Sequence, residues 1–276
     1  MIPKKSLFSA DIKIAFIGGG KMAGAIISGL LKSLAVVPSQ IFVFDIDKKR
    51  LAFLKKTYGI KTARSNQEIL SLSRIVILAL KPQKFAEALN GLDFSKVGLV
   101  ISIAAGVKLE YLQDKIPGKP VIRVMPNNPA LVQAGITAIV SSAESKKEDI
   151  EIAKSIFRTV GEVVETKEYL MDAITALSGS GPGFVYQFVE AMIEGAESLG
   201  LVKSVAEKLA VQTLLGSAQT LVKTKISARE LKEMVTSPNG TTKAGLDVFE
   251  KKGFKQIVID AIFAAAKRAK ELGGSS

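Results

Sequence analysis

The chain has no cysteine, no histidine and no tryptophan. Without cysteine it can form no disulfide and offers no thiolate nucleophile. Without histidine it lacks the commonest metal ligand and the commonest acid–base side chain of enzymes. We therefore expect no metal site, and any catalytic mechanism has to run without an imidazole. Apolar residues make up 47% of the 276 residues, which is enough for one large domain or two moderate ones with a sizeable core.

Basic–aromatic clusters and membrane-length apolar runs are missing too. The net charge is +12, but the basic residues stand in scattered pairs such as Lys55-Lys56 and Lys251-Lys252. A solvated surface that favours anionic ligands explains this charge better than nucleic-acid binding. The run VGLVISIAAGV is far shorter than the ~20 residues that span a bilayer, and the N-terminal MIPKKSLFSADIK lacks the apolar core of a signal peptide. We expect a cytoplasmic protein that binds neither nucleic acid nor membranes.

Up to about residue 165, apolar strands alternate with amphipathic helices. After a first strand that ends at Gly18, strands are expected at residues 41–45, 74–80, 98–104, 121–125, 136–141 and 161–166. This order predicts an α/β fold with a doubly wound, mostly parallel sheet. Residues 1–167 are the predicted dinucleotide-binding domain.

The remaining residues, 168–276, carry helical patterns only. Two breaks, SGSGPG and TSPNG, interrupt these helices, and several of the helices are apolar around much of their circumference. Such helices would leave apolar surface uncovered in a lone chain. We therefore expect a helical domain that forms a homodimer and helps to bind substrate.

The stretch IAFIGGGKMAGAI, residues 14–26, is the first motif that indicates chemistry. A buried strand ends at Gly18, and Gly18, Gly20 and Ala23 give the pattern G-x-G-x-x-A before a helical repeat. Glycine permits the tight turn and the close approach of a pyrophosphate, and the helix start offers unpaired N–H groups. A plain strand-to-helix turn is the alternative, but the full context favours a dinucleotide phosphate site.

Polar residues follow three later strands, where ligands of doubly wound sheets bind. Asp45 ends the second strand and is suited to an adenosine ribose, whereas Lys48, Lys49 and Arg50 could reach a 2′-phosphate. The choice between NADH and NADPH therefore stays open. Lys81 and Pro82 follow another strand, and RVMPNNP places Asn127 in a rigid polar turn.

The two breaks in the helical half resemble each other. SGSGPG, residues 178–183, and SPNGTTKAG, residues 237–245, each join small residues to the start of a helix. Ordinary helix caps would explain either one. Two together, beside a nucleotide domain, favour the walls of a pocket for a small carboxylate.

Taken in order, the motifs FIGGGKMAGAI, ALKPQ, SIAAG, RVMPNNPALV, ALSGSGP, FVEAMIEGAESLGL and SPNGTTKAG cover nearly the whole chain. In this the sequence resembles the pyrroline-5-carboxylate reductases. The resemblance implies a Rossmann-type domain, a helical dimerisation domain, and dimers that associate further into a decameric ring. It implies NADPH-dependent reduction of 1-pyrroline-5-carboxylate to L-proline, with NADH as the alternative donor. The active site would combine one subunit's nucleotide domain with helices of its partner.

The resemblance also assigns residues. With the strand-end residues named above, the expected cofactor contacts are Gly18, Gly20, Lys21, Met22, Asp45, Lys48, Ala79, Lys81, Pro82 and Asn127. The expected substrate contacts are Ser178, Gly179, Ser180, Gly181, Pro182, Gly240, Thr241 and Thr242, with Thr242 as the catalytic donor to the ring nitrogen. The chain departs from the family pattern at Lys21, Asn128 and Asn239, where Asn, Thr and Gly are more usual.

The implied chemistry suits a chain without histidine. A cyclic imine nitrogen is basic enough to arrive protonated, so hydride transfer needs an orienting hydroxyl and carboxylate donors rather than a strong acid. A 3-hydroxyacid dehydrogenase would need a lysine on the helix after the domain crossing, and GPGFVYQFVEAM has none. A nucleotide-binding regulatory protein without turnover is the second alternative, and the intact SGSGP and NGTT motifs count against it.

Overall fold

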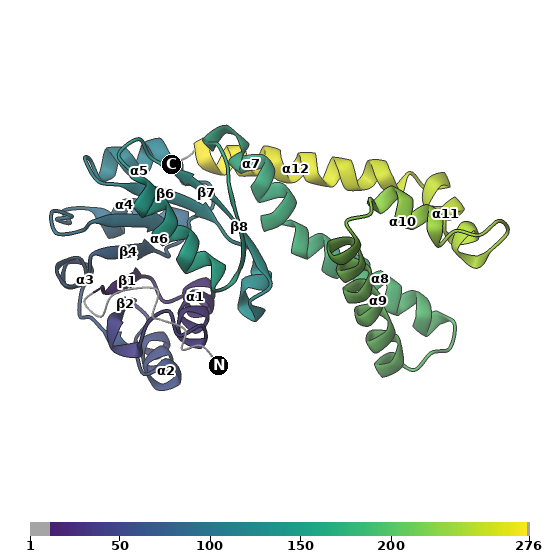
Figure 1. Ribbon diagram of the computed structural model, residues 1–276, viewed down its shortest axis with the longest axis horizontal. Coiled ribbons are helices and arrows are strands. Elements are labelled where there is room, and N and C mark those ends of the chain that lie inside the picture. The colour runs from purple at the N-terminus through teal and green to yellow at the C-terminus, as the bar shows by residue number, and fades with distance from the viewer. Residues whose placement is uncertain (1–11, 275–276) are drawn as a thin grey trace. The chain divides into compact units, whose positions relative to one another are not determined.

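The computed structural model describes residues 12–274 and is drawn in Figure 1. Packing within the chain divides it into two compact units. The first unit holds the described residues up to Ser180 together with residues 265–274, and the second is Gly181–Ala264. The domain boundary after residue 167 stays a prediction. The N-terminal segment for which we expect no signal peptide lies almost wholly outside the described residues.

The first unit is built on one eight-stranded sheet. Its strands are β1 (Ile14–Ile17), β2 (Ile41–Phe44), β3 (Lys61–Thr62), β4 (Ile75–Leu78), β5 (Leu99–Ser102), β6 (Val121–Met125), β7 (Gly135–Ser141) and β8 (Gly161–Glu165). Their order is β3-β2-β1-β4-β5-β6-β7-β8, and all neighbours are parallel except β6 and β7. The predicted doubly wound, mostly parallel sheet is confirmed.

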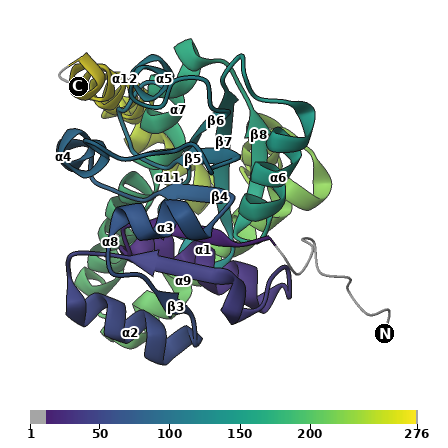
Figure 2. The same cartoon turned by 90° about the vertical axis from the view of Figure 1, so that its left-hand side faces the viewer.

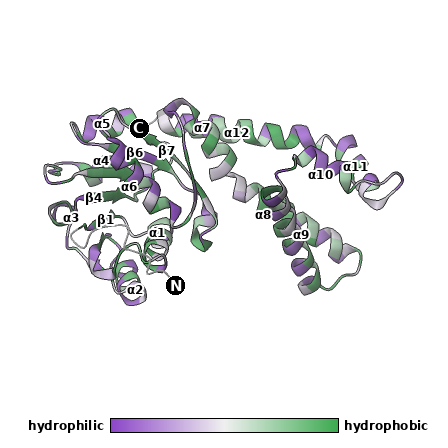
Figure 3. Cartoon of the chain, viewed as in Figure 1, coloured by the Kyte–Doolittle hydropathy of each residue, from purple (hydrophilic) through white to green (hydrophobic). Residues whose placement is uncertain are grey.

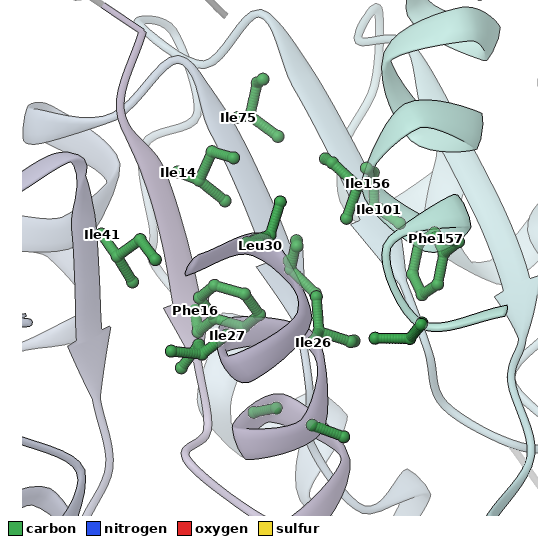
Figure 4. Close-up of a cluster of buried hydrophobic side chains, with 14 of the residues drawn as sticks. Ile14, Phe16, Ile26, Ile27, Leu30, Ile41, Ile75, Ile101, Ile156 and Phe157 are labelled. Carbon is green, nitrogen blue, oxygen red and sulfur yellow. The ribbon is translucent and has the colours of Figure 1, made fainter. Parts of the chain in front are cut away.

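Helices cover both faces of this sheet (Figure 2). They are α1 (Lys21–Lys32), α2 (Lys48–Tyr58), α3 (Asn66–Leu72), α4 (Phe85–Leu89), α5 (Leu109–Lys115) and α6 (Lys147–Arg158). Alternate strand residues point to opposite faces. Phe16 therefore packs with Ile26 of α1 and Phe157 of α6 on one face, as Figure 4 shows, while Ile17 belongs to the core on the α3, α4 and α5 side. Burial on both faces accounts for the continuous apolar runs of the strands.

The position of β1 decides where a ligand can bind. The chain passes from β1 outward to β2 and β3, and then returns to β4 on the other side of β1. The crossovers therefore leave in opposite directions at the carboxyl ends of β1 and β4, which creates the crevice that ligands of open α/β sheets occupy. Gly18 follows β1 at this point, and Ala79 follows β4.

Helices form the rest of the chain. They are α7 (Met171–Ile174), the π-helical turn η5 (Thr175–Gly179), α8 (Gly181–Ser198), α9 (Lys203–Thr224), α10 (Ala228–Met234), α11 (Thr241–Lys251) and α12 (Phe254–Gly274). The segment SGSGPG, expected to be a break, is instead mostly helical. The N–H of Ser180 donates to the carbonyl of Thr175 at 2.8 Å and closes the π-turn. Such turns occur frequently at functional sites.

The second unit has little core of its own. Phe249 and Phe254 stack at 4.8 Å between ring centroids, and α8 packs on α9. In α9 only Ala206 and Ala210 are buried. Figure 3 shows hydrophobic residues along α8, α9 and α12, and many large ones are exposed, among them Val185, Tyr186, Val205, Leu209, Val211, Leu215, Val248, Phe249 and Ile257. Within residues 12–274, no helix is both long and apolar enough to cross a membrane.

Candidate functional site

The glycine loop after β1 is fixed by close backbone contacts. Gly18 has a φ of +97°, and its N–H donates to the carbonyl of Phe44 at 2.8 Å. A Cβ at this residue would stand 2.4 Å from the carbonyl oxygen of Ala79. Only glycine meets both conditions. Gly18 therefore lets β1, β2 and β4 converge at their carboxyl ends.

Gly20 differs from Gly18 because the space beside it is open. A Cβ on Gly20 would meet no atom within 4 Å. Gly20 is also the N-cap of α1, and no side chain caps this helix. A free first helical turn beside an open glycine backbone is the geometry that holds a pyrophosphate. Lys21, the first residue of α1, is exposed there, whereas Met22 packs against the core.

Asp45 braces the glycine loop from the end of β2. Its two carboxylate oxygens accept the backbone N–H groups of Gly19, at 2.6 Å, and of Asp47, at 2.8 Å. Asp47 in turn caps α2 by accepting from the N–H groups of Lys49 and Arg50. Two carboxylates therefore stand where the sequence predicts the adenosine ribose, each already engaged by backbone donors.

Arg50 has a role that sequence reasoning did not assign. Its guanidinium donates to the carbonyls of Gly19 and Gly20, and lies 5.0 Å from the ring centroid of Phe53. The same guanidinium fills the space that a side chain on Gly24 would need. Arg50 is thus committed to the glycine loop, while Lys48 at the start of α2 is exposed. The sequence of the basic run at residues 48–50 does not indicate which of its side chains contacts the glycine loop.

The ends of β4 and β6 carry the other predicted cofactor residues. The N–H of Ala79 donates to the carbonyl of Ile17 at 2.8 Å, which keeps Ala79 beside the glycine loop. Lys81 is the exposed N-cap of a short 3-10 helix, and Pro82 is its first residue. Asn127 is buried, and its side-chain oxygen accepts the N–H of Ile136 at 2.9 Å. That bond fixes the orientation of the Asn127 side-chain amide, whose oxygen is engaged and whose NH2 group is the donor that a ligand could meet.

The predicted substrate residues 178–180 belong to the end of the π-turn. The hydroxyl of Ser178 donates to the carbonyl of Ile174 at 2.9 Å. A Cβ on Gly179 would stand 2.6 Å from Cε of Met125, the last residue of β6. The structure therefore brings the end of β6 into contact with this segment, a relation that sequence spacing could not reveal.

Thr241 and Thr242 begin α11. Both are exposed, and among the described residues neither hydroxyl has a hydrogen-bond partner. The N-cap of α11 is Gly240, and no side chain caps the helix. Asn239 has a φ of +58°, a conformation that asparagine adopts more readily than most residues. The departure from glycine at this position therefore keeps a left-handed turn.

Comparisons with known proteins agree with this arrangement. Residues 168–272 match the family model for pyrroline-5-carboxylate reductase dimerisation, and residues 13–106 match that for NADP oxidoreductase, coenzyme F420-dependent. The pyrroline-5-carboxylate reductase of Synechocystis sp. is 43% identical, over 95% of this chain and 99% of the relative. The chain belongs to the pyrroline-5-carboxylate reductase family.

Solved structures support the same assignment. The pyrroline-5-carboxylate reductase of Coxiella burnetii superposes with a TM-score of 0.86 at 37% identity, covering 95% of this chain and 98% of that one. The pyrroline carboxylate reductase of Plasmodium falciparum, solved with NADP bound, gives a TM-score of 0.88 at 30% identity, covering 96% and 99%. The expected fold, enzyme class and helical dimerisation region are confirmed.

As a pyrroline-5-carboxylate reductase, the chain is an NADP-binding oxidoreductase that produces proline and self-associates through its helical region. The open backbone at Gly20 and the uncapped start of α1 fit a dinucleotide phosphate. In the part of the chain that the structure describes, no group of three acidic residues is placed to hold a metal ion.

Proposed function

We propose that the reduction takes place between two sets of residues. The cofactor set is Gly18, Gly20, Lys21, Met22, Asp45, Lys48, Ala79, Lys81, Pro82 and Asn127. The substrate set is residues 178–182 and 240–242, with Thr242 as the catalytic residue. The observation that carries this proposal is the uncapped start of α11, where two exposed threonine hydroxyls have no partner within the described residues.

The chemistry asked of these residues is modest. Bound NADPH supplies the hydride for the imine carbon. Thr242 orients the ring nitrogen through its hydroxyl, and the N–H groups at the start of α11 hold the substrate carboxylate. Backbone donors and a hydroxyl suffice because the protonated imine is already electrophilic. This is why the enzyme can dispense with histidine and cysteine.

NADPH is the donor we propose as preferred, with NADH as a second donor. Lys48 and Lys49 are exposed at the start of α2 and are available to a 2′-phosphate. Arg50 is engaged by the glycine loop, so it braces the site instead of binding a 2′-phosphate. Asp45 and Asp47 place negative charge near the proposed 2′-phosphate position, which weakens the preference for NADPH over NADH.

We further propose that one subunit's nucleotide domain forms the site together with helical elements of its partner, Thr241 and Thr242 at the start of α11 among them, and that dimers associate into a decameric ring. The exposed apolar residues of the second unit support burial against a partner. Light scattering would distinguish two chains of 29.4 kDa from ten. Cytoplasmic location stays a prediction.

The experiment that tests the proposed site is a 340 nm assay with pyrroline-5-carboxylate on the wild type and on Thr242→Ala. We expect turnover to fall by about 10²-fold while NADPH binding is unchanged, because the hydroxyl acts on the substrate alone. Thr220→Ala is the matched control, since the Thr220 hydroxyl donates to the carbonyl of Gly216 within its own helix. Lost NADPH binding in Thr242→Ala, or unchanged turnover, would refute the assignment.

A further inference from the structure

Arg123 places a positive charge inside β6. It is only 3% exposed, and its guanidinium forms an ion pair with the carboxylate of Glu168. Glu168 begins a short 3-10 helix that leads into α7, and it also accepts the N–H of Leu109, the first residue of α5, at 3.1 Å. The pair therefore joins β6, α5 and the start of residues 168–180.

The pair is not fully satisfied. Nε of Arg123 and Oε2 of Glu168 are both buried, and within residues 12–274 neither has a hydrogen-bond partner. Unpartnered buried polar atoms lower stability. The Glu168 side chain as a whole is 36% exposed, so solvent screens its charge, and apolar residues of similar volume often replace even a fully buried ion pair without loss. Stability alone therefore gives little reason for this ion pair. What the pair does is hold the carboxylate of Glu168 beside β6 and the start of α5.

The far end of residues 168–180 lies against the same strand. Met125 follows Arg123 by two positions, so both side chains lie on one face of β6. The methyl of Met125 touches Gly179, and Met171 is buried in the core between the two ends. Residues 168–180 are therefore held to β6 at both ends, and β6 leads directly into the turn that carries Asn127.

We propose that Arg123 and Glu168 are positioning residues that set residues 178–180 against the Asn127 turn. This inference rests on the proposed role of residues 178–180 in substrate binding. Neither Arg123 nor Glu168 touches the substrate; they act through β6 and the helical turns that follow Glu168. Loss of the pair shifts residues 178–180 and weakens binding of the pyrroline. The glycine loop, which β1, β2 and β4 hold, keeps its affinity for NADPH.

The test uses the full-length enzyme with the double variant Arg123→Met/Glu168→Met, which removes both charges without leaving one unpaired. We expect the KM for pyrroline-5-carboxylate to rise about tenfold while the Kd for NADPH stays within about twofold. Glu168→Gln, which keeps an acceptor for Arg123 and Leu109, should give an intermediate KM. Glu151→Gln is the control, because it also weakens ion pairs, here to Lys154 and Arg158, but these pairs involve neither β6 nor residues 168–180.

Three readouts decide the outcome. An unchanged KM with an altered melting temperature would show a structural pair only and overturn the inference. Parallel rises in the KM and in the Kd for NADPH would overturn it too, because the effect would not be confined to residues 178–180. Ser180→Ala distinguishes failure of the proposed substrate role of residues 178–180 from failure of the positioning role of Arg123 and Glu168. If Ser180→Ala leaves the KM unchanged, the proposed substrate role of this segment fails. If it raises the KM and the double variant does not, only the positioning role fails.

Discussion

The methyl group of Met125 lies against the backbone of Gly179, so close that a Cβ on residue 179 would stand 2.6 Å from it. Met125 ends β6, and Gly179 ends the π-turn η5. The contact joins the strand end that leads to the turn of Asn127, a predicted cofactor contact, with a segment predicted to bind substrate. Two motifs far apart in the sequence thus share one packing contact.

Gly179→Ala should separate stability from substrate binding. The added methyl displaces the flexible end of Met125, which lowers stability, whereas alanine gains about 1 kcal/mol over glycine within a helix. Because these two effects oppose each other, the melting temperature should change little. The KM for pyrroline-5-carboxylate should rise several-fold because residues 178–180 move. Steady-state kinetics and thermal unfolding check both effects. An unchanged KM would show that this contact does not matter for the substrate.

Gly18→Ala and Gly20→Ala should fail in different ways. Gly18 has a positive φ and would collide with a backbone carbonyl, so its variant should lose more than about 1 kcal/mol of folding free energy. Gly20 has a φ of −59° and open space beside it, so its variant should keep its stability and lose affinity for NADPH. Denaturant unfolding and cofactor titration measure the two losses. Equal stability losses would contradict this interpretation.

Asp45→Ser should shift the cofactor preference. Removing the carboxylate removes a charge that repels a 2′-phosphate, so the ratio of kcat/KM with NADPH to that with NADH should rise about tenfold. Its bonds to Gly19 and Asp47 are also lost, at about 1.5 to 3 kcal/mol of stability. Asp47→Ser, which keeps a helix cap, is the comparison. A ratio that stays constant would show that Asp45 is a brace only.

Mixed dimers should reveal whether the site is shared between subunits. Thr242→Ala and Gly20→Val are each expected to be nearly inactive alone. Co-expressed and purified by two different tags, the mixed dimer should recover about half of wild-type activity, since one of two symmetric sites would be intact. No recovery in a verified mixed dimer would place Gly20 and Thr242 of each site in one subunit.

Asn239 should tolerate glycine and resist branched side chains. Its φ of +58° is accessible to glycine at no steric cost, so Asn239→Gly should leave turnover and melting temperature close to wild type. Asn239→Val should cost about 1 to 2 kcal/mol and reduce turnover, because the turn before Thr241 cannot form without strain. Thermal unfolding with the 340 nm assay tests this. A stable and fully active Asn239→Val would show that the turn is not needed.

The sequence predicted the strands that frame the cofactor edge because each is a short, continuous apolar run. The turn at Gly18 was predictable because glycine is the residue that a positive φ allows. The π-turn was not, since small residues in SGSGPG are as typical of a break as of a widened helix. An arginine in the otherwise apolar stretch VIRVM indicates a buried charge that needs a partner, but no feature of the sequence near Arg123 identifies Glu168 as that partner.

The sequence by itself determined the family through the resemblance of its ordered motifs. It also determined the doubly wound sheet and the tight turn of the glycine loop, because periodicity and glycine placement are local properties of the chain. Only the tertiary structure decided that Asp45 accepts from Gly19, that Arg50 turns back to the loop, and that Met125 meets Gly179. These contacts join residues distant in sequence, and it is the packing of the sheet and its helices that brings them together.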